Sequence, residues 1–325
     1  MADKSAQAAS RKSSKFQKEL QDIHKKQQKR KLKSSIELDP AINIDEYTAF
    51  AEHLKSSTRI LALLGAGLSA ASGIPTFRGA GGFWREHDVT DLASPEGFFK
   101  NPSLVWQFYN YRRHQALTAM PNRAHIALAK LAKQKPGFLA ITQNIDGLSE
   151  QANHSPSQLE RIHGSLFEVR CTNKACEFQE TNYTDPIVPA LQLPEDQDIG
   201  DANFPLREVP RADLPHCPKC VDSLLRPGIV LFGEAVPQPV TERIGEWLDK
   251  GQIDLMLVIG TTAIVYPAAG YIHIARVNHA RVAVVDMEVK DGDDVQREQD
   301  GDWFFQGDAS VIVPELLKEV IGRVP

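Results

Sequence analysis

Residues 60–79 have the sequence ILALLGAGLSAASGIPTFRG, and this stretch decides the fold. The apolar run 60–64 has no polar alternation, which favours a strand buried on both faces of a parallel sheet. Gly65-Ala66-Gly67 follows directly, and such small residues let backbone N–H groups approach a bound phosphate. The small residues behind them predict the start of a helix, whose positive end favours the same anion. A strand followed by G-x-G is also typical of a tight turn without a ligand, because the next glycine is only Gly73.

The composition is typical of a globular protein with one large domain and a smaller module. The chain has 325 residues, of which 42% are hydrophobic and 24% charged, and its net charge is −5. This charge gives no reason to expect direct nucleic-acid binding by the core. The sequence contains no apolar run of membrane-spanning length and no signal-peptide segment. We therefore expect an intracellular protein that does not associate with membranes.

Residues 1–35 differ from the rest because Lys, Arg, Gln and Ser dominate and apolar residues are scarce. This composition indicates a disordered basic tail, with a nuclear-import or nucleic-acid arm and a mitochondrial presequence as alternatives. Presequences are usually Arg-rich and poor in acids, whereas this segment is Lys-rich and contains Asp3, Glu19 and Asp22. We therefore favour the cytoplasm or nucleus over the mitochondrion, and we expect a monomer.

Strand and helix signals alternate along the remaining chain. Besides 60–64, apolar runs predict strands at 138–142, 253–259 and 281–285. Helices are predicted at 45–56, from 102 onward, at 124–135 with Asn122 as the cap, and at 268–278. This alternation predicts an α/β fold with a Rossmann-like, doubly wound parallel sheet.

The predicted domain limits follow from these signals and from a segment rich in Pro and Asp. We place the main domain at 36–325, with its Rossmann-like core at about 45–80, 136–170 and 225–325, a helical insert at about 81–135, and a smaller inserted module, which contains all four cysteines, at about 171–224.

Polar or small residues follow three of the predicted strands. They are Gln143-Asn144-Ile145-Asp146-Gly147, Gly260-Thr261-Thr262 and Asp286-Met287-Glu288. The carboxyl ends of parallel strands meet at one edge of an open sheet, where α/β proteins bind ligands. The sequence therefore predicts a ligand along this edge.

The four cysteines of the chain are Cys171, Cys176, Cys217 and Cys220. Their C-x4-C and C-x2-C pairs can place four thiolates around one tetrahedral Zn²⁺. Four thiolates leave no open position for water, so the predicted site is structural.

Two further residues are ambiguous from their sequence context alone. His163 follows the polar stretch after the second strand, but a lone histidine is more often a structural hydrogen-bonding group than a catalyst. Glu234 is either a salt-bridge partner or a site residue.

Taken in order, these motifs resemble those of the sirtuins, which are NAD-dependent protein lysine deacylases. The matching segments span roughly residues 40–315 and comprise 65–78, 142–148, His163-Gly164, the four cysteines, Arg226-Pro227 with 232–234, and 260–262 with 266–268. The resemblance implies NAD⁺ as cofactor, one structural Zn²⁺, and acyl-lysine proteins as substrates.

The resemblance also implies His163 and Asn144 as catalytic residues. The acyl-lysine amide oxygen attacks the ribose C1′ of NAD⁺ and releases nicotinamide. His163 then acts as a general base on the ribose hydroxyl, and hydrolysis gives lysine and O-acyl-ADP-ribose.

The residues implied to contact NAD⁺ lie mainly at the strand ends. They are Gly65, Ala66, Gly67, Ser69, Thr76, Phe77, Arg78, Trp84, Gln143, Asn144, Ile145, Asp146, Gly260, Thr261, Thr262, Asp286, Met287 and Glu288. Asp286 stands where the family often has Asn, which alters one predicted contact with the adenosine ribose. Residues 229–232 are expected to form the acyl-lysine channel, where the peptide pairs as an added strand. Val230, Phe232, Gly233 and Glu234 are the residues of this region that are expected to bind the substrate.

Tyr109 and Arg112 resemble the Tyr-x-x-Arg pair of the class III sirtuins, which remove succinyl, malonyl and glutaryl groups. Arginine can bind a distal carboxylate bidentately, a phenol adds a donor, and Ala93 leaves room for the longer chain. Alternatively, Tyr109 and Arg112 are only a helix pair one turn apart, and the protein is an ordinary deacetylase. A non-catalytic NAD-sensing module is less favoured, because His163 and Asn144 are both present.

Overall fold

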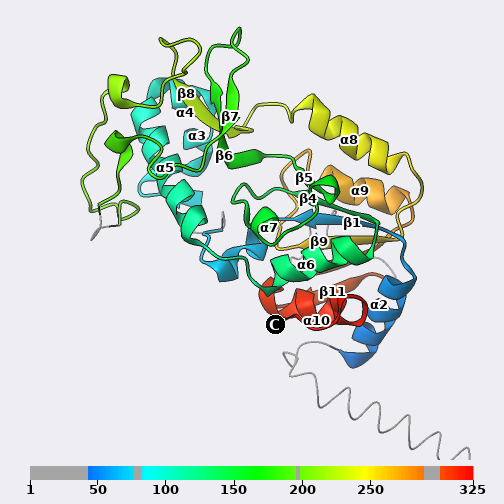
Figure 1. The fold of residues 1–325 in the computed structure, drawn as a ribbon. Helices are drawn as coiled ribbons and strands as arrows, with labels where there is room; N and C mark the ends of the chain where they lie inside the picture. Colours follow the sequence, from blue (N-terminus) through cyan, green and yellow to red (C-terminus); the bar gives the residue numbers. More distant parts are fainter. Residues whose placement is uncertain (1–42, 77–81, 195–197, 289–300, 325) are drawn as a thin grey trace, which may run out of the picture. The chain divides into compact units, whose positions relative to one another are not determined.

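The structure is a computed structural model that describes residues 43–76, 82–194, 198–288 and 301–324. The predicted basic tail at 1–35 and the predicted cofactor residues Phe77 and Arg78 lie outside the described residues. Residues from Ile44 onward form one compact unit (Figure 1).

A six-stranded sheet has the order β11-β10-β9-β1-β4-β5, and its neighbouring strands are all parallel. Its strands are β1 (Arg59–Leu64), β4 (Gly137–Thr142), β5 (Leu159–Arg161), β9 (Leu255–Ile259), β10 (Arg281–Asp286) and β11 (Trp303–Gln306). The chain proceeds outward from β1 to β4 and β5, and then continues on the other side of β1. This is the strand order of dinucleotide-binding Rossmann folds, with the reversal point between β1 and β9.

Helices cover both faces of this sheet, so the predicted doubly wound α/β fold is confirmed (Figure 1). One face carries α2 (Ile44–Ser56), α6 (Arg123–Gln134) and α10 (Ala309–Ile321), and the other carries α8 (Gln238–Leu248) and α9 (Gly270–Val277). Successive strand residues point to opposite faces, and Leu61 and Ala62 of β1 are both fully buried. The sheet is therefore hydrophobic on both sides, as the unalternating strand sequences predict.

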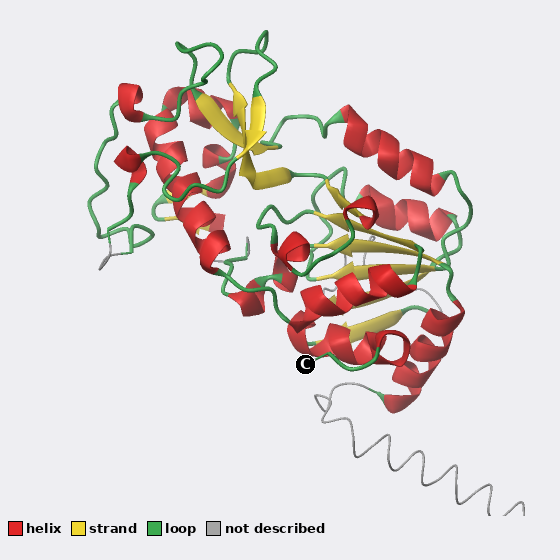
Figure 2. Ribbon diagram, viewed as in Figure 1, coloured by secondary structure: helices red, strands yellow, loops and turns green. Residues whose placement is uncertain are grey.

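A second, three-stranded antiparallel sheet has the order β7-β6-β8 (Figure 2). It consists of β6 (Gly164–Cys171), β7 (Gln179–Thr181) and β8 (Leu225–Ile229). Trp106 and Phe108 of the helix α5 (Pro102–Thr118) lie in one hydrophobic cluster with Leu166 and Val169 of β6. The predicted helical insert and zinc-binding module therefore share a single core, to which the predicted Rossmann-like segments contribute β6 and β8.

Short elements complete the fold. They are β2 (Phe83–Trp84), β3 (His87–Asp88), α3 (Val89–Leu92), α4 (Pro95–Lys100), α7 (Leu148–Gln151) and the 3₁₀ turns Ala66–Leu68, Ala70–Ser72, Pro156–Gln158, Pro189–Leu191 and Arg211–Asp213.

The predicted helix behind Gly67 is not an α-helix, which corrects the sequence-based expectation. Residues 66–72 form two consecutive 3₁₀ turns, and Gly73 ends them in the left-handed region with φ of 84°. Such short turns are common where glycine and serine lower the helix propensity. No extended helix macrodipole therefore begins here.

The predicted cap of α6 is confirmed. Asn122 accepts a hydrogen bond from the backbone N–H of Ala124 (3.0 Å). Its side-chain amide also donates to the carbonyl of Leu68 (2.8 Å) and to the hydroxyl of Ser72 (3.1 Å). Asn122 therefore begins α6 and at the same time holds the two 3₁₀ turns behind β1.

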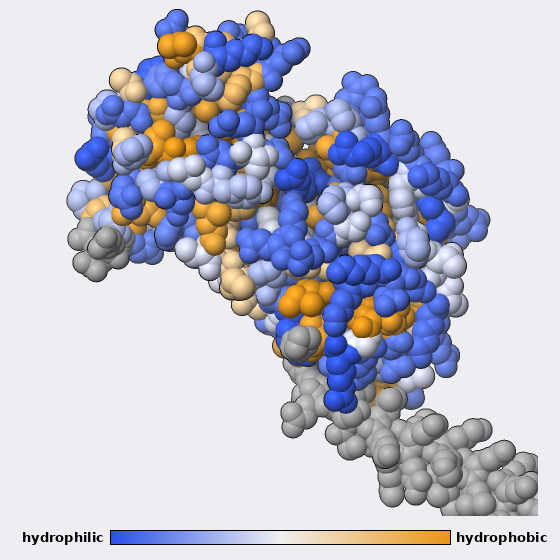
Figure 3. Space-filling view, in the orientation of Figure 1, coloured by the Kyte–Doolittle hydropathy of each residue, from blue (hydrophilic) through white to orange (hydrophobic). Residues whose placement is uncertain are grey.

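The face of the molecule seen in Figure 3 is predominantly hydrophilic, with scattered hydrophobic patches. Among the helices of the described residues, none is both long and apolar enough to cross a membrane.

Candidate functional site

The loops that follow β1 and β9 pack directly against each other at the reversal point of the sheet. Gly65 N–H donates to the carbonyl of Ile259 (2.9 Å), and Gly67 N–H donates to that of Gly260 (2.8 Å). A Cβ atom on Gly65 would lie 2.5 Å from Cβ of Thr261, and one on Gly67 would lie 2.7 Å from Cα of Gly260. The two glycines are therefore required for close packing of the loops, and their N–H groups donate to the backbone carbonyls of Ile259 and Gly260.

A polar network brings together the segments that follow β1, β4 and β9. The Ser69 hydroxyl donates to Oδ2 of Asp146 (2.7 Å), and the Asn144 amide donates to the Ser69 hydroxyl (3.2 Å) and to the Gly65 carbonyl (2.9 Å). The Gln143 amide donates to the hydroxyl of Thr261 (2.9 Å). Residues that the sequence predicted at separate strand ends thus form one hydrogen-bonded site.

His125 belongs to the same network, although the sequence analysis did not select it. Its Nδ1 accepts the backbone N–H of Asn122 (3.3 Å), so Nε2 carries the proton and donates to the Ser69 hydroxyl (3.3 Å). Burial lowers the pKa of His125 to about 4, which keeps the ring neutral. The available sequence signal was a polar residue three positions after a predicted cap, the spacing of a capping box.

Asp146 is a buried carboxylate at the centre of this network. Burial raises its pKa, whereas hydrogen bonds from Leu148 N–H (2.9 Å) and Ser69, together with the charge of Arg112, lower it. Burial likewise lowers the pKa of Arg112, and the neighbouring Tyr109 and Asp146 oppose this shift. Electrostatic coupling therefore joins the helix α5 to the network at the strand ends.

His163 lies between β5 and β6, next to the same network. Its Nδ1 is 3.0 Å from the carbonyl oxygen of Gln143, and because a carbonyl can only accept, Nδ1 is the protonated nitrogen. Nε2 therefore carries the lone pair. Burial lowers the pKa of His163, so the ring is neutral near pH 7 and can accept a proton at Nε2.

Tyr109 presents a buried polar atom that lacks a protein partner. The residue is 1% exposed, and its hydroxyl makes no hydrogen bond to any group of the described residues. Burial raises its pKa, so the hydroxyl is a neutral donor. Its ring packs 4.7 Å from that of Phe108, and the Arg112 guanidinium lies 5.5 Å from the same Phe108 ring.

The segment 230–234 contains the predicted substrate-binding residues, and we call it the channel segment. It continues from β8 and contacts both His163 and Ala93. Val230 N–H donates to the carbonyl of His163 (3.0 Å), and Phe232 N–H donates to that of Ala93 (2.8 Å). The Phe232 side chain is 48% exposed, and Gly233 turns the chain with φ of 87°.

Glu234 is a salt-bridge partner, the first of the two interpretations that its sequence allows. Its carboxylate accepts hydrogen bonds from Arg226 (2.7 and 2.8 Å), Arg170 (2.8 Å) and the N–H of Leu231 (3.0 Å).

The other predicted cofactor residues are more dispersed. Trp84 lies in the smaller core with its ring 5.4 Å from Phe108. The carbonyl of Ile145 accepts from Leu166 N–H (2.9 Å), which joins the polar loop to β6. Asp286 is buried at the end of β10, where its carboxylate accepts from Glu288 N–H (3.3 Å). Three further predicted contacts, Ala66, Thr76 and Thr262, are partly exposed, and Met287 is exposed.

The four cysteines lie together and fit one structural Zn²⁺. Their Sγ atoms are all within 4.8 Å of one another, with 3.9 Å between Cys171 and Cys220 and 3.8 Å between Cys176 and Cys217. These separations are far longer than a disulfide bond of about 2.05 Å. They match the edge of a tetrahedron with Zn–S bonds of about 2.3 Å.

Comparisons with known proteins agree with this geometry. A protein named NAD-dependent protein deacylase from Candida albicans strain SC5314 is 38% identical over 301 residues, which cover 85% of this chain and 98% of that protein. A protein named NAD-dependent protein deacylase sirtuin-5, mitochondrial, from Xenopus tropicalis is 41% identical over 263 residues, covering 79% and 82%. The crystal structure of a Sir2 homolog–NAD complex is 32% identical, has a TM-score of 0.70, and covers 87% of this chain and 96% of its own.

A sequence model of the Sir2 family matches residues 65–267, more than half of the chain. The matched region runs from the first glycine of the β1 loop through His163 and the four cysteines to the loop after β9. With the Rossmann strand order and the cysteine cluster in place, this match shows that the chain belongs to the Sir2 family.

Proposed function

We propose that this chain is an NAD-dependent protein lysine deacylase that prefers acidic acyl groups such as succinyl, malonyl and glutaryl. Family membership and the deacylase names of its relatives support the NAD-dependent reaction on lysine side chains of proteins. The acyl preference is carried by one observation, the buried hydroxyl of Tyr109, which has no hydrogen-bond partner among the described residues and lies one helical turn from Arg112.

An unsatisfied buried hydroxyl is costly, because it has lost its hydrogen bonds to water. The penalty is about 1–3 kcal/mol for a buried polar group without a partner. A carboxylate at the distal end of an acyl chain would accept a hydrogen bond from the Tyr109 hydroxyl and pair with the Arg112 guanidinium. Ala93 is small, so its side chain leaves space for an acyl group longer than acetyl. An acetyl group has no distal acceptor, and it would leave Tyr109 unsatisfied.

The residues of the network would position NAD⁺ and the acyl-lysine. When bound, NAD⁺ supplies the ribose carbon to which the acyl oxygen is transferred. Asn144 is held by Ser69 and Gly65, so its amide is fixed at the reacting end of the site. His163 would accept a ribose hydroxyl proton at Nε2, because its Nδ1–H is held by Gln143. The loops containing Gly65 and Thr261 would accommodate the pyrophosphate, and the roles of Phe77 and Arg78 remain predictions.

Glu234 is assigned an indirect part in substrate binding. Since its carboxylate is occupied by Arg170 and Arg226, we propose that it shapes the segment 230–234 instead of contacting the acyl-lysine. Val230, Phe232 and Gly233 would form the channel and pair with the peptide backbone.

The test is a comparison of one peptide carrying acetyl-, malonyl- or succinyl-lysine, with and without NAD⁺. We expect strong NAD-dependent turnover of the acidic acyl peptides. Substitution Arg112→Met should lower kcat/KM for the succinyl peptide by about 100-fold, because a charge-assisted bidentate contact is lost. Activity on the acetyl peptide should change little, and this peptide is the internal control. Equal loss of both activities would contradict the acidic pocket and favour an ordinary deacetylase.

We also propose that the enzyme acts inside the cell, as a monomer, with the cytoplasm or nucleus favoured. None of the four cysteines is in a disulfide, which supports a reducing compartment. The Xenopus relative is named mitochondrial, and fractionation of cells expressing the full chain would separate the three compartments. Light scattering of the purified chain would test the monomer.

A further inference from the structure

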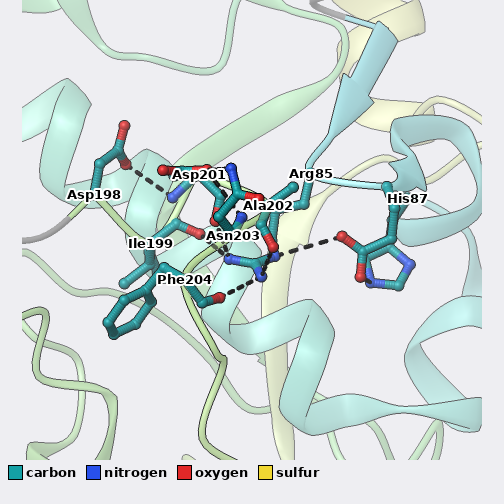
Figure 4. Close-up of polar contacts among 10 residues, drawn as sticks. Arg85, His87, Asp198, Ile199, Asp201, Ala202, Asn203 and Phe204 are labelled. Carbon is teal, nitrogen blue, oxygen red and sulfur yellow. Dashed lines mark hydrogen bonds and ion pairs between the residues drawn. The ribbon is translucent and has the colours of Figure 1, made fainter.

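Arg85 holds a segment that lies 114 to 119 residues further along the chain. Its NH1 group donates to the carbonyls of Ile199 (2.8 Å) and Asp201 (2.6 Å), and its NH2 group donates to those of Ala202 (3.0 Å) and Phe204 (2.5 Å) (Figure 4). The side chain is only 5% exposed. All four protons of the two terminal amino groups are thus engaged by backbone oxygens.

The backbone of Arg85 has an unusual conformation, which the contacts of its side chain help to hold. Its φ of 60° lies in the left-handed region, which costs a non-glycine residue roughly 1–2 kcal/mol. Arg85 occupies the turn between β2 and β3, next to Trp84. In this conformation, the Arg85 side chain fastens the β2–β3 hairpin to the segment 198–204.

A continuous series of ring contacts leads from this hairpin to the acyl-recognition pair. The Trp84 ring lies 5.4 Å from that of Phe108 and 6.3 Å from that of Tyr111. The Phe108 ring in turn contacts Tyr109 and the Arg112 guanidinium, at 4.7 and 5.5 Å. The face of α5 that carries Tyr109 and Arg112 therefore packs, through Phe108, on a hairpin that Arg85 holds.

The same hairpin also determines where Ala93 lies. Asp88 of β3 caps the start of α3 by accepting the N–H of Thr90 (2.7 Å), and Ala93 caps its other end, directly after Leu92. The Ala93 carbonyl then accepts from Phe232 of the channel segment (2.8 Å). Both sides of the proposed acyl pocket are thus connected to the hairpin at Arg85.

We propose that Arg85 is a positioning residue that fixes the pocket of Tyr109, Arg112 and Ala93 by fastening the β2–β3 hairpin to segment 198–204, and that it thereby sets the preference for acidic acyl groups. This inference rests on the proposed function of Tyr109 and Arg112. A bidentate carboxylate contact depends steeply on geometry, and displacements of about 1 Å can cost up to 100-fold in rate. An acetyl group does not reach Arg112, so turnover of the acetyl peptide should not depend on a displacement of the pocket residues.

The test uses Arg85→Gly, since glycine adopts the left-handed backbone freely and only the side-chain contacts are removed. Arg85→Lys keeps the charge but offers three donors without the planar fork. Arg207→Gly is the matched control, because Arg207 is exposed on the same part of the chain. For each protein, kcat and KM are measured with succinyl and acetyl forms of one peptide at saturating NAD⁺.

We expect Arg85→Gly to raise KM for the succinyl peptide about tenfold more than KM for the acetyl peptide. Arg85→Lys should also raise KM for the succinyl peptide more than KM for the acetyl peptide, but by a smaller factor. Arg207→Gly should have the same KM values as the wild type. Guanidinium ion at millimolar concentration should partly restore the succinyl KM of Arg85→Gly. Thermal melting and zinc content identify folded variants, and if Arg85→Gly does not fold, Arg85→Lys provides the test.

Equal changes of kcat and KM for the succinyl and acetyl peptides would overturn the inference. They would mean that Arg85 stabilises the fold as a whole and does not act on the acyl pocket in particular. A wild-type enzyme that does not prefer the succinyl peptide would overturn the proposed function itself. The wild-type comparison is therefore made first, and it distinguishes the two failures.

Discussion

Two adjacent arginines of α5 show how strongly a residue's role depends on its surroundings. Arg113 is fully buried and donates to the carbonyls of Leu166 (2.5 Å), Asn182 (2.9 Å) and Thr184 (3.0 Å), which joins α5 to the smaller sheet. Arg112 instead shares charge interactions with Tyr109 and Asp146. The sequence motif singled out Arg112, whereas only the tertiary contacts explain Arg113, because its partners are backbone carbonyls 53 to 71 residues away.

Two buried histidines predict a loss of stability at mildly acidic pH. Burial lowers the pKa of His125 and of His154 to about 4, from the ordinary value of 6.5 that is expected in the unfolded chain. Above pH 6.5 both rings are neutral in both states. As the pH falls from 6.5 to 4, the unfolded chain binds protons that the folded chain does not, so the free energy of unfolding decreases by up to roughly 3 kcal/mol per histidine.

Urea unfolding between pH 7.5 and pH 5 measures this effect. The midpoint concentration should fall with pH in the wild type. His154→Phe should make the fall shallower, because phenylalanine cannot titrate and the site already packs on the Phe138 ring. An identical pH dependence in the two proteins would contradict the assignment to His154.

At the scale of elements, the loops after β1 and β9 pack so tightly that a larger residue does not fit between them. Gly67→Ala would place a Cβ atom 2.7 Å from Cα of Gly260, which is backbone and cannot move aside cheaply. We expect a loss of roughly 1–3 kcal/mol in stability from overpacking. NAD⁺ affinity, measured by calorimetry, should fall at least about tenfold, because the loops that would accommodate the pyrophosphate separate.

Gly245→Ala in α8 is the control for this substitution. A Cβ atom there meets nothing within 4 Å, and alanine favours a helix interior over glycine by up to about 1 kcal/mol. Its stability should stay the same or increase, with NAD⁺ affinity unchanged. Equal tolerance of Gly67→Ala and Gly245→Ala would show that the loop contact is not required for the site.

Elements with strong local signals could be predicted from the sequence. The strands β1 and β4 are unbroken apolar runs, and α6 begins at a cap residue, so each signal lies within a few neighbouring residues. The edge strand β5 has only three residues, and β11 lies close behind an acidic polar stretch, so neither has a clear pattern. The 3₁₀ turns at 66–72 depend on contacts with Asn122, the cap residue before α6, and no local pattern encodes these contacts.

At the scale of the whole molecule, the site's residue types were predictable, but their connections were not. The motif segments at 65–78, 142–148 and 260–262 were identified by their resemblance to the sirtuin motifs, and parallel strand ends must meet at one edge of the sheet. The link through His125 and the engagement of the Gly65 and Gly67 N–H groups arise only when distant segments pack.

Zinc removal should loosen a helix that contains no cysteine. The cysteine cluster and α5 belong to the same hydrophobic core, and the Trp106 indole donates to the carbonyl of Leu225 (2.9 Å), close to Cys220 in sequence. We expect one Zn²⁺ per chain by mass spectrometry. Chelation should lower the melting temperature and increase hydrogen exchange in α5, because binding and folding are coupled.

The helix α2, which packs against α10 and the larger sheet, is the internal reference for this exchange measurement. Its exchange should change little on chelation. Absence of metal in the purified chain, or equal exchange increases in α2 and α5, would contradict this prediction.

The shared core of the two inserts limits how relatives of this protein can be recombined. The smaller lobe is assembled from two separate excursions of the chain, one between β1 and β4 and one between β5 and β9. In a chimera that exchanges only one excursion, the core side chains of the exchanged excursion would come from one protein and those of the other excursion from another, so they would not pack well together. Transfer of acyl specificity between homologous enzymes should therefore succeed when both excursions are exchanged together, with four crossover points at the strands of the larger sheet.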